Sequence, residues 1–539
     1  MYHTVRVYAY CSIEDCNTLR SKGWKYIDIV HVADYSAGPG EAALKDERRI
    51  YVSINRDGGN SEGKEGWSVC KWLLGQSIEE RRRWIHYSAV DEVTEDALYN
   101  CLLSATEPAF NCTDVQDTDN GVPENPLVTV YSSTYNSRDK IMKPFKSLLK
   151  QTYKNWEWIV VDDSTDADTW TKYLSVMHEK LPSRVKVYDT EGTSITEYVK
   201  EKRQYRPMHC GLIGKMKGLA VSKGKGDILL ELDHDDELVP GALQRIVDAF
   251  LRNKSAGFVY SSCCEVHDKT LEGRTYGHDF AFGYGTYWKQ WDSDIKTVLC
   301  PMVNSRLTAT AVKHLVSLPN HPRAWARSAY ERAGGYRSAL LVADDYDLLM
   351  RTFLTNRYAE IPDVLYRQYL YQQTGNTLIN VTYSRNEQIQ ILVRHLYNRY
   401  HDRLMKRCTD LGLPLQIRHM QYKNVLDFSD DDPRNQHATI IDYNRGTVPK
   451  IVFYHISLNA TTDIHISQDY IKDEDTVICI FIEDTPDGDR EKMVIDLAKQ
   501  LPDGKVKWRV TDQRISIDAE KKWAKYIHGV DKLLTEIVM

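Results

Sequence analysis

The sequence predicts an α/β protein: a central domain with a mostly parallel sheet and helices on both faces, flanked by two smaller α/β domains. Between residues 127 and 262, apolar strand-like runs alternate with helical stretches. Strands that are apolar on both faces indicate a parallel sheet covered by helices. Shorter alternations of the same kind open and close the chain, and its 539 residues exceed one ordinary core.

The domain boundaries are expected where this pattern breaks. Residues 1–120 form the predicted N-terminal domain, with three apolar runs and a helical stretch near 77–104. The polar stretch 111–126 contains one glycine and two prolines and is a predicted linker. Residues 121–400 form the predicted central domain. Residues 401–539 form the predicted C-terminal part, with the end of a charged helical segment expected over 384–420 and a small α/β domain that starts near residue 449.

Polar clusters follow three of the five strands expected in the central domain. These strands span 127–133, 156–161, 184–189, 227–232 and 257–262, with helical stretches at 138–151, 168–180, 209–222 and 240–252. The clusters STYN, DDSTD and DHDD follow the first, second and fourth strands. Because ligands of parallel α/β sheets bind beyond the carboxyl ends of the strands, these clusters indicate a site at one sheet edge.

Composition excludes several classes of protein. The net charge of −6 gives no global basic field for nucleic acid. No apolar run approaches the roughly 18–20 residues of a membrane span, and the N-terminus lacks the apolar core of a signal peptide. The 11 cysteines are odd in number and form no CxxC pair, which favours free thiols in a reducing compartment. A cytoplasmic location is therefore expected.

The cluster DHDD ends the apolar strand 227–232 and is a candidate metal site. Residues i and i+2 of a strand share a face, so Asp233 and Asp235 are expected to point together. Two carboxylates on one side suit a hard divalent cation, Mn²⁺ or Mg²⁺. The alternative is an acidic loop in which Asp236 or Glu237 favours the N-terminus of the next helix.

Five stretches, in chain order, resemble family 2 of the GT-A glycosyltransferases. They are LVTVYSSTYNSRD, SLLKQTYKNWEWIVVDDSTD, GKGDILLELDHDDEL, WARSAYERAGGYR and ADDYDLLMR. The resemblance covers residues 127–378. It implies a GT-A fold, which is a Rossmann-like sheet with helices on both faces, and inverting transfer of a sugar from a nucleotide sugar.

The resemblance also implies roles for individual residues. Asp345 aligns with the general base and Asp344 with the acid that precedes it. Asp233 and Asp235 would hold Mn²⁺ or Mg²⁺ on the diphosphate. The donor nucleotide would be bound by Thr134, Tyr135, Asn136, Asp162, Asp163 and Asp233.

The residues themselves leave simpler interpretations open. Asp162 and Asp163 could cap the helix expected near residue 168, and Asp345 could be a helix N-terminal charge. Arg351 lies six residues after Asp345 and so on another face of the helix. We expect Arg351 to be a structural ion-pair partner.

The chain also departs from the family pattern. Ser133 stands where the family commonly has proline, and Tyr369 stands where a family histidine would help to hold the metal or a phosphate. A metal site here would therefore need another ligand. The Q-x-x-R-W motif of processive synthases is not evident, which argues against a processive membrane enzyme.

The expected function is metal-assisted transfer of a sugar from a donor, by analogy a UDP-sugar, to a hydroxyl group of a glycan or another acceptor. Two alternatives remain at this point. A nucleotidyltransferase would also use an α/β sheet and paired acids, but it leaves ADDYDLLMR without a role. A non-catalytic nucleotide- or sugar-binding module is the other. DNA as acceptor gains no support from the net charge.

Overall fold

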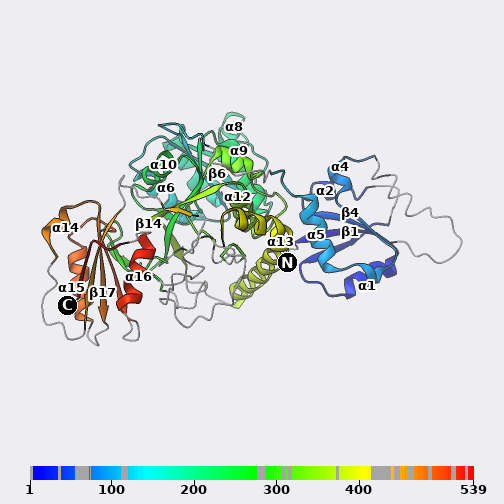
Figure 1. Ribbon diagram of the computed structural model, residues 1–539. Coiled ribbons are helices and arrows are strands. Elements are labelled where there is room, and N and C mark those ends of the chain that lie inside the picture. The colour runs from blue at the N-terminus through cyan, green and yellow to red at the C-terminus, as the bar shows by residue number, and fades with distance from the viewer. Residues whose placement is uncertain are drawn as a thin grey trace.

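The computed structural model describes most of the chain and confirms the predicted α/β class. The described residues are 4–33, 38–54, 72, 75–110, 119–275, 287–302, 304, 307, 311–313, 318–371, 376–413, 439–441, 449–457, 466–483, 488–511, 517–528 and 532–538. A large central sheet lies between two smaller α/β units, one formed by each end of the chain (Figure 1).

The N-terminal unit is a parallel sheet of four strands in the order β2-β1-β3-β4. Its strands are β1 (Val5–Tyr10), β2 (Ile27–His31), β3 (Arg49–Ile54) and β4 (Trp84–Tyr87), and its helical elements are α1 (Ile13–Ser21), α2 (Glu41–Leu44), α4 (Ile78–Arg81), η1 (Val90–Glu92) and α5 (Glu95–Ala105). The continuous helical stretch expected near 77–104 is wrong. Strand β4 interrupts it, because WIHY has two aromatic rings and a β-branched residue, which favour a pleated strand.

The central sheet has the strand order β15-β14-β10-β13-β8-β5-β6-β7, with β9 beside β14. Its strands are β5 (Val128–Thr134), β6 (Trp156–Asp162), β7 (Val185–Tyr188), β8 (Ile228–Glu231), β9 (Glu237–Leu238), β10 (Ala256–His267), β13 (Arg323–Ala326), β14 (Arg357–Leu370) and β15 (Thr439–Ile441). Neighbours pair in parallel except that β13 runs antiparallel to β8 and β10, and β9 antiparallel to β14. The start of β13 therefore lies at the same edge as the ends of β5, β6 and β8.

Helices cover both faces of this sheet. They are η2 (Arg138–Ile141), α6 (Met142–Leu149), η3 (Thr169–Leu174), α7 (Ser175–Lys180), α8 (Ile195–Lys200), α9 (Ile213–Lys223), α10 (Ala242–Arg252), α11 (Arg327–Arg332), α12 (Asp344–Thr355) and α13 (Asn376–Asp410). Val130 and Val160 belong to a core with α6 and α10, whereas Tyr131 and Val161 belong to one with α9, α12 and α13. Alternate residues of each strand thus face opposite layers, as expected for a doubly covered sheet.

The C-terminal unit is a second four-stranded parallel sheet, in the order β18-β17-β16-β19. Its elements are β16 (Lys450–Ile456), α14 (Gln468–Lys472), β17 (Thr476–Glu483), α15 (Asp489–Ala498), β18 (Val506–Thr511), α16 (Ile517–His528) and β19 (Thr535–Val538). The hairpin of β11 (Gln290–Asp292) and β12 (Thr297–Leu299) joins it through backbone hydrogen bonds between Lys289 and Trp508. A short turn, η5 (Ala311–Lys313), completes the described elements.

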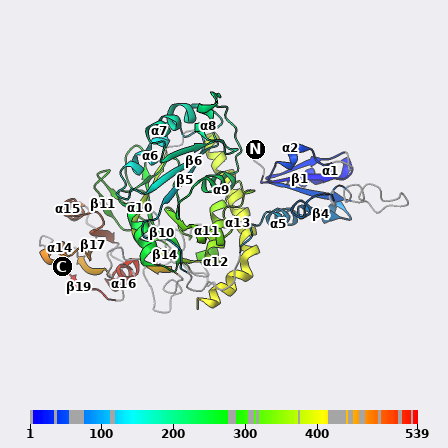
Figure 2. The same ribbon diagram turned by 90° about the horizontal axis from the view of Figure 1, so that it is seen from above.

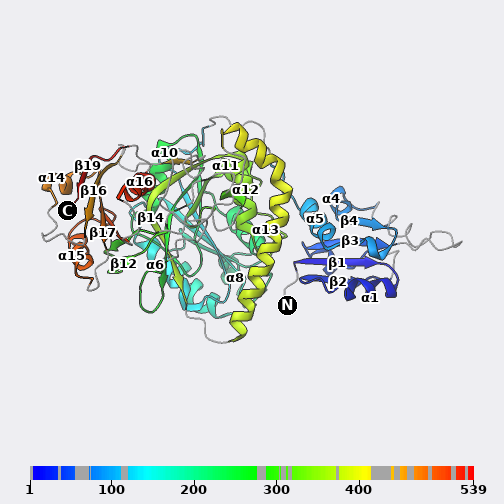
Figure 3. The same ribbon diagram turned by 60° about the horizontal axis from the view of Figure 1, so that its bottom comes forward.

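Helix α13 joins the N-terminal unit to the central sheet. It runs along the side of the central part that faces this unit (Figures 2 and 3). Tyr99 of α5 stacks on His395 of α13, with ring centroids 4.8 Å apart. The apolar core of the N-terminal unit is continuous with the core beneath α12 and α13. The N-terminal unit is therefore packed against the central part.

The domain limits at 120 and 400 remain predictions. Helix α13 spans residue 400, and β15, a strand of the central sheet, comes from Thr439–Ile441. Residues 111–118 of the predicted linker and 414–420 of the predicted helical segment lie outside the described residues. Among the described helices, none combines the length and apolar character needed to cross a membrane.

Candidate active site

The carboxyl edge of the central sheet gathers the three polar clusters of the sequence. Thr134 ends β5 and pairs in register with Asp162, which ends β6. Glu231 ends β8 and pairs with Tyr131 of β5, so Asp233 follows at the same edge. The predicted convergence of STYN, DDSTD and DHDD is observed.

The residues after β5 form a loop that is tied to the loop after β6. Asn136 donates its backbone N–H to Ser164 Oγ at 2.9 Å, and its side-chain oxygen accepts the Thr165 N–H at 3.0 Å. Asn136 holds a positive φ of 48°, which asparagine tolerates better than most residues. Thr134 is buried beside Ser137, whereas Tyr135 is 45% exposed. Tyr135 therefore presents its ring at the surface of this edge.

Asp162 and Asp163 hold the neighbouring segments in place. Asp162 accepts hydrogen bonds from Ser164 Oγ at 2.6 Å and from Tyr205 Oη at 2.8 Å, and burial raises the pKa of Asp162 to about 6. Asp163 accepts the backbone N–H groups of residues 210 and 211. Asp162 also accepts the Ser164 N–H in a local turn, rather than capping the helix that follows.

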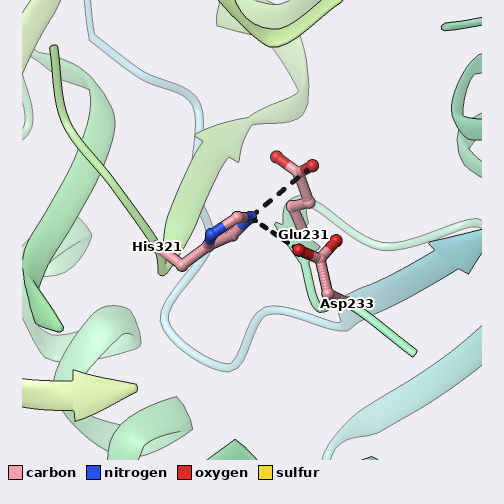
Figure 4. Close-up of side chains that lie close together, drawn as sticks. All are labelled: Glu231, Asp233 and His321. Carbon is pink, nitrogen blue, oxygen red and sulfur yellow. Dashed lines mark ion pairs between the residues drawn. The ribbon is translucent and has the colours of Figure 1, made fainter. Parts of the chain in front are cut away.

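His321 lies against two acids of this edge, Glu231 and Asp233 (Figure 4). His321 Nε2 is 3.5 Å from Asp233 Oδ2 and 3.8 Å from Glu231 Oε1. His321 is only 7% exposed, and within the part of the chain that the structure describes neither of its ring nitrogens has a hydrogen-bond partner. One atom from each of the three residues lies within 4.8 Å of the others, which is compact enough for a metal ion.

Two buried cationic side chains form ion pairs with acids at this edge. Lys217 Nζ is 2.5 Å from Glu231 Oε1 and 3.2 Å from Asp344 Oδ2. Arg323 is 3.5 Å from Glu231 Oε2 through Nη1 and 3.1 Å from Asp345 Oδ2 through Nη2. Burial alone would raise the pKa of Glu231, but the charges of Lys217 and Arg323 outweigh it and hold that pKa well below its ordinary value.

The two predicted acids at the start of α12 differ in exposure. The side chain of Asp345 is 25% exposed and that of Asp344 is 6% exposed. Burial raises the pKa of Asp344 to about 6, although Lys217 opposes this shift. Asp345 is thus the more accessible of the pair, with its carboxylate oriented by Arg323.

Within DHDD, the side chains have different surroundings. Asp235 is 25% exposed, and its backbone oxygen accepts the Tyr371 Oη–H at 2.9 Å. His234 pairs through Nδ1 with Ser137 Oγ at 2.9 Å. Asp236 is buried and accepts hydrogen bonds from Tyr366 Oη and from the Tyr369 N–H. Asp233 and Asp235 are therefore partly open, whereas Asp236 is a structural residue.

The charges at this edge leave an excess of negative charge that suits a divalent cation. We call the following residues the edge cluster: Glu231, Asp233, Asp344 and Asp345 with Lys217 and Arg323. Four carboxylates face two cations, with His321 between two of the acids. Carboxylate oxygens and a buried imidazole without hydrogen bonds are a donor set that fits Mn²⁺.

Sequence reasoning missed Lys217, Glu231, His321 and Arg323. Glu231 ends β8 two residues before Asp233, and that spacing could have drawn attention to it. Tyr369, at the position of the family histidine, donates its hydroxyl to Glu237 at 2.8 Å and lies 3.4 Å beneath Lys143 Nζ. The Tyr369 hydroxyl is thus bonded to Glu237 rather than to the acids beside His321.

Comparison with known proteins supports the family resemblance. Residues 129–194 match the family model described as "Glycosyl transferase family 2", which confirms the resemblance over this segment. Chondroitin synthase of Pasteurella multocida is 22% identical over 281 residues, which cover 52% of this chain and 24% of that protein. The chain thus spans about a quarter of the length of this relative.

A second relative is shorter. The UDP-Glc:alpha-D-GlcNAc-diphosphoundecaprenol beta-1,3-glucosyltransferase WfgD of Escherichia coli is 28% identical over 148 residues, which cover 28% of this chain and 50% of that protein. Among solved structures, S. aureus TarS 1-349 in complex with UDP-GlcNAc has a TM-score of 0.33 and 17% identity, with 56% of this chain and 79% of that chain covered.

Proposed function

We propose that this protein is an inverting glycosyltransferase that moves a sugar from a UDP-sugar to a hydroxyl group of a glycan. The observation that carries the proposal is the edge cluster, which lies where a parallel sheet binds its ligand and next to the segment that matches family 2. The name of WfgD, which gives a UDP-linked donor and a β-linked product, supports the choice of donor and the inversion.

The donor nucleotide would lie over the loops after β5 and β6. Its proposed contacts are Thr134, Tyr135, Asn136, Asp162, Asp163 and Asp233. The exposed ring of Tyr135 and the linked turns around Asn136 support this assignment, because a nucleobase needs an aromatic surface and a fixed backbone. Asp162 and Asp163 would contribute by fixing the loops that contact the nucleotide, because their carboxylates already accept hydrogen bonds from neighbouring segments.

Mn²⁺ or Mg²⁺ is the proposed cofactor, with Asp233 and Asp235 as oxygen ligands. The excess of carboxylates over cations in the edge cluster supports a divalent ion there. When bound, the ion would offset the charge that develops on the departing diphosphate. Lys217 and Arg323 already pair with Glu231 and with the acids of α12, and they would stay paired with these acids when the ion is bound.

Asp345 is the proposed general base. Its carboxylate would take the proton of the acceptor hydroxyl while that oxygen attacks the anomeric carbon, and a single displacement of this kind inverts the sugar. The greater exposure of Asp345 supports its choice over Asp344, whose carboxylate is buried against Lys217. Arg323, 3.1 Å from Asp345, would orient the base.

The protein is proposed to act in the cytoplasm. The nine cysteines in the described residues form no disulfide with one another, which fits a reducing compartment. A glycan is the proposed acceptor by analogy with the relatives, whose names include chondroitin synthase.

A thermal-shift screen of nucleotide sugars tests this function. A donor that binds the native protein raises the melting temperature by mass action. We expect a UDP-sugar to raise it with Mn²⁺ and much less with a chelator. A nucleoside triphosphate that stabilises the protein more than any nucleotide sugar would favour the nucleotidyltransferase. Stabilisation without any turnover of the bound donor would favour the non-catalytic binding module.

A further inference from the structure

We infer that His321 would be a nitrogen ligand, together with Asp233, of the divalent cation proposed for this site. The inference rests on the proposed function, because that function supplies the reason for a cation at the edge cluster. It adds a residue that the family resemblance did not indicate. It also gives the ligand that the chain needs because Tyr369 replaces the family histidine.

The distance between the two donor atoms suits a shared ion. His321 Nε2 and Asp233 Oδ2 are 3.5 Å apart. Two ligand atoms that each lie about 2.1 Å from one ion are about 3.0 Å apart at the octahedral angle of 90° and about 3.4 Å apart at the tetrahedral angle. A direct hydrogen bond between them would need a separation of about 2.7–3.2 Å. The pair is therefore spaced as two ligands rather than as donor and acceptor.

The imidazole of His321 is buried, with 7% of the residue exposed. Among the described residues, neither ring nitrogen has a partner at hydrogen-bond distance and angle. Burial of a polar group without a partner is unfavourable, so such groups call for an explanation. A metal ion on Nε2 would supply the missing interaction. By contrast, His234 uses Nδ1 to contact Ser137 Oγ.

The surroundings hold the ring and the acid together. The ring of His321 stacks on Tyr366, with centroids 4.8 Å apart and planes inclined by 20°. The Tyr366 hydroxyl accepts the Asp233 N–H at 3.1 Å and donates to Asp236 Oδ2 at 2.9 Å. One tyrosine thus orients the histidine and fixes the backbone of the aspartate, which is the preorganisation that metal ligands need.

The competing interpretation is a structural ion pair between protonated His321 and the two acids. Glu231 already has closer cationic partners, since Lys217 Nζ is 2.5 Å from Glu231 Oε1. A third cation would therefore add little for Glu231. The two interpretations differ in one measurable respect: only a ligand places its nitrogen on the metal.

Pulsed electron paramagnetic resonance of Mn²⁺ bound to the full-length protein, without nucleotide, tests the inference. We expect modulation from a directly bound ¹⁴N in the wild type, and its replacement by the ¹⁵N pattern when the protein is labelled with ¹⁵N-histidine. His321→Gln should abolish the nitrogen signal and weaken Mn²⁺ binding by about 10–100-fold, as the loss of groups around a metal commonly does.

His234→Gln is the matched control, because His234 belongs to DHDD but is hydrogen-bonded to Ser137. It should leave the nitrogen signal unchanged. No Mn²⁺ binding, Mn²⁺ without nitrogen coupling in the wild type, or coupling that persists in His321→Gln would each overturn the inference. The labelling experiment decides the matter in the wild type even if the variant does not fold.

Separate titrations with UDP-sugars distinguish this inference from the proposed function. Nitrogen-coupled Mn²⁺ in a protein that binds no nucleotide sugar would support the His321 ligand and refute the transferase. Mn²⁺-dependent binding of a nucleotide sugar without nitrogen coupling would do the reverse.

Discussion

Helix α12 carries three acids within its first turn, and they differ in how completely their charges are paired. Asp344 and Asp345 belong to the edge cluster, in which acids outnumber cations. Asp347, two residues later, contacts two arginines and a tyrosine. We call this second group the brace cluster: Asp347, Arg337, Arg351 and Tyr400.

The Asp347 carboxylate of the brace cluster has a complete set of partners, and its role is structural. Arg337 Nη2 and Arg351 Nη2 lie 3.1 Å and 2.6 Å from the Asp347 carboxylate, and Tyr400 Oη donates to it at 2.7 Å. Burial would raise the pKa of Asp347, but the two arginines outweigh it and hold that pKa far below its ordinary value. Arg337 also donates to the backbone oxygen of Leu103 in α5. The expectation that Arg351 is a structural ion-pair partner is confirmed.

The difference separates stability from chemistry. A buried charge with a complete set of partners is fixed and contributes to a single packed state, whereas acids with incomplete partners leave room for a cation and a substrate. We therefore expect substitutions in the edge cluster to affect turnover and substitutions in the brace cluster to affect folding.

Asp345→Asn should have the largest effect. Asparagine keeps the size and polarity of the side chain but cannot take a proton at neutral pH. If the base supplies the typical 10²–10⁴-fold, kcat falls by about that factor while donor affinity stays nearly intact. Steady-state kinetics at saturating donor measure this loss.

Asp344→Asn is the control for that experiment. It has the neighbouring position but a buried carboxylate paired with Lys217, so its loss of kcat should be milder. A wild-type rate in Asp345→Asn together with an inactive Asp344→Asn would mean that the base is the other carboxylate.

Asp347→Asn should destabilise the fold by about 3–5 kcal/mol, because it leaves two buried arginines with one charge fewer between them. Urea unfolding measures the loss. The fraction that remains folded should keep near wild-type kcat. A variant that is as stable as the wild type but inactive would assign Asp347 to the chemistry and remove the distinction between the clusters.

The pH dependence of stability tests the same difference between the two clusters. The pKa of Asp347 is lowered in the folded state, so its ion pairs stabilise the protein above the ordinary pKa of 3.8 and this contribution is lost as the pH falls below that value. The free energy of unfolding of Asp347→Asn should therefore depend less on pH between about 5 and 3 than that of the wild type. Parallel pH profiles would contradict the pairing.

Asp235→Ala should weaken Mn²⁺-dependent binding of UDP by roughly tenfold or more, since even groups outside the first ligand shell commonly contribute that much. The fold should be nearly unaffected, because the Asp235 side chain is partly exposed and only its backbone oxygen bonds Tyr371. Calorimetry with UDP and Mn²⁺ measures the change. Unchanged affinity would remove Asp235 from the metal site.

Glu387→Gln should have the smallest effect. Glu387 pairs with Lys25 across the contact between α13 and the N-terminal unit, but both side chains are largely exposed. Solvent screens such pairs, so the urea midpoint should not change measurably. A clear loss of stability would show that this contact depends on exposed pairs as much as on the brace cluster.

The sequence was sufficient to predict the edge of the sheet but not the partners that gather there. DHDD follows an apolar strand, so local pattern located Asp233, whereas Asp345, at a helix start, was indicated by the family resemblance. His321 lies two residues before β13 and Arg323 begins it, and no pattern indicated this four-residue strand. Their meeting with Glu231 depends on the antiparallel register of β13 with β8, which is a property of the whole sheet.

Lys217 shows the same limit on a helix. Its stretch was expected to be helical, but nothing in the sequence around it indicates that this lysine would be buried between Glu231 and Asp344. That position follows from how α9 packs between the sheet and α12. Ion pairs between elements that are far apart in the sequence therefore could not be predicted from the sequence, either here or in the brace cluster.

Release of UDP from a UDP-sugar by the full-length protein, followed with Mn²⁺ and with a chelator, is the decisive test of the proposed transferase activity. We predict release that requires the metal and rises when a suitable acceptor is added, with a product of inverted anomeric configuration. If UDP-sugars and other nucleotide sugars are neither bound nor cleaved with Mn²⁺ or Mg²⁺, the edge cluster is not a transferase site and the proposed function is refuted.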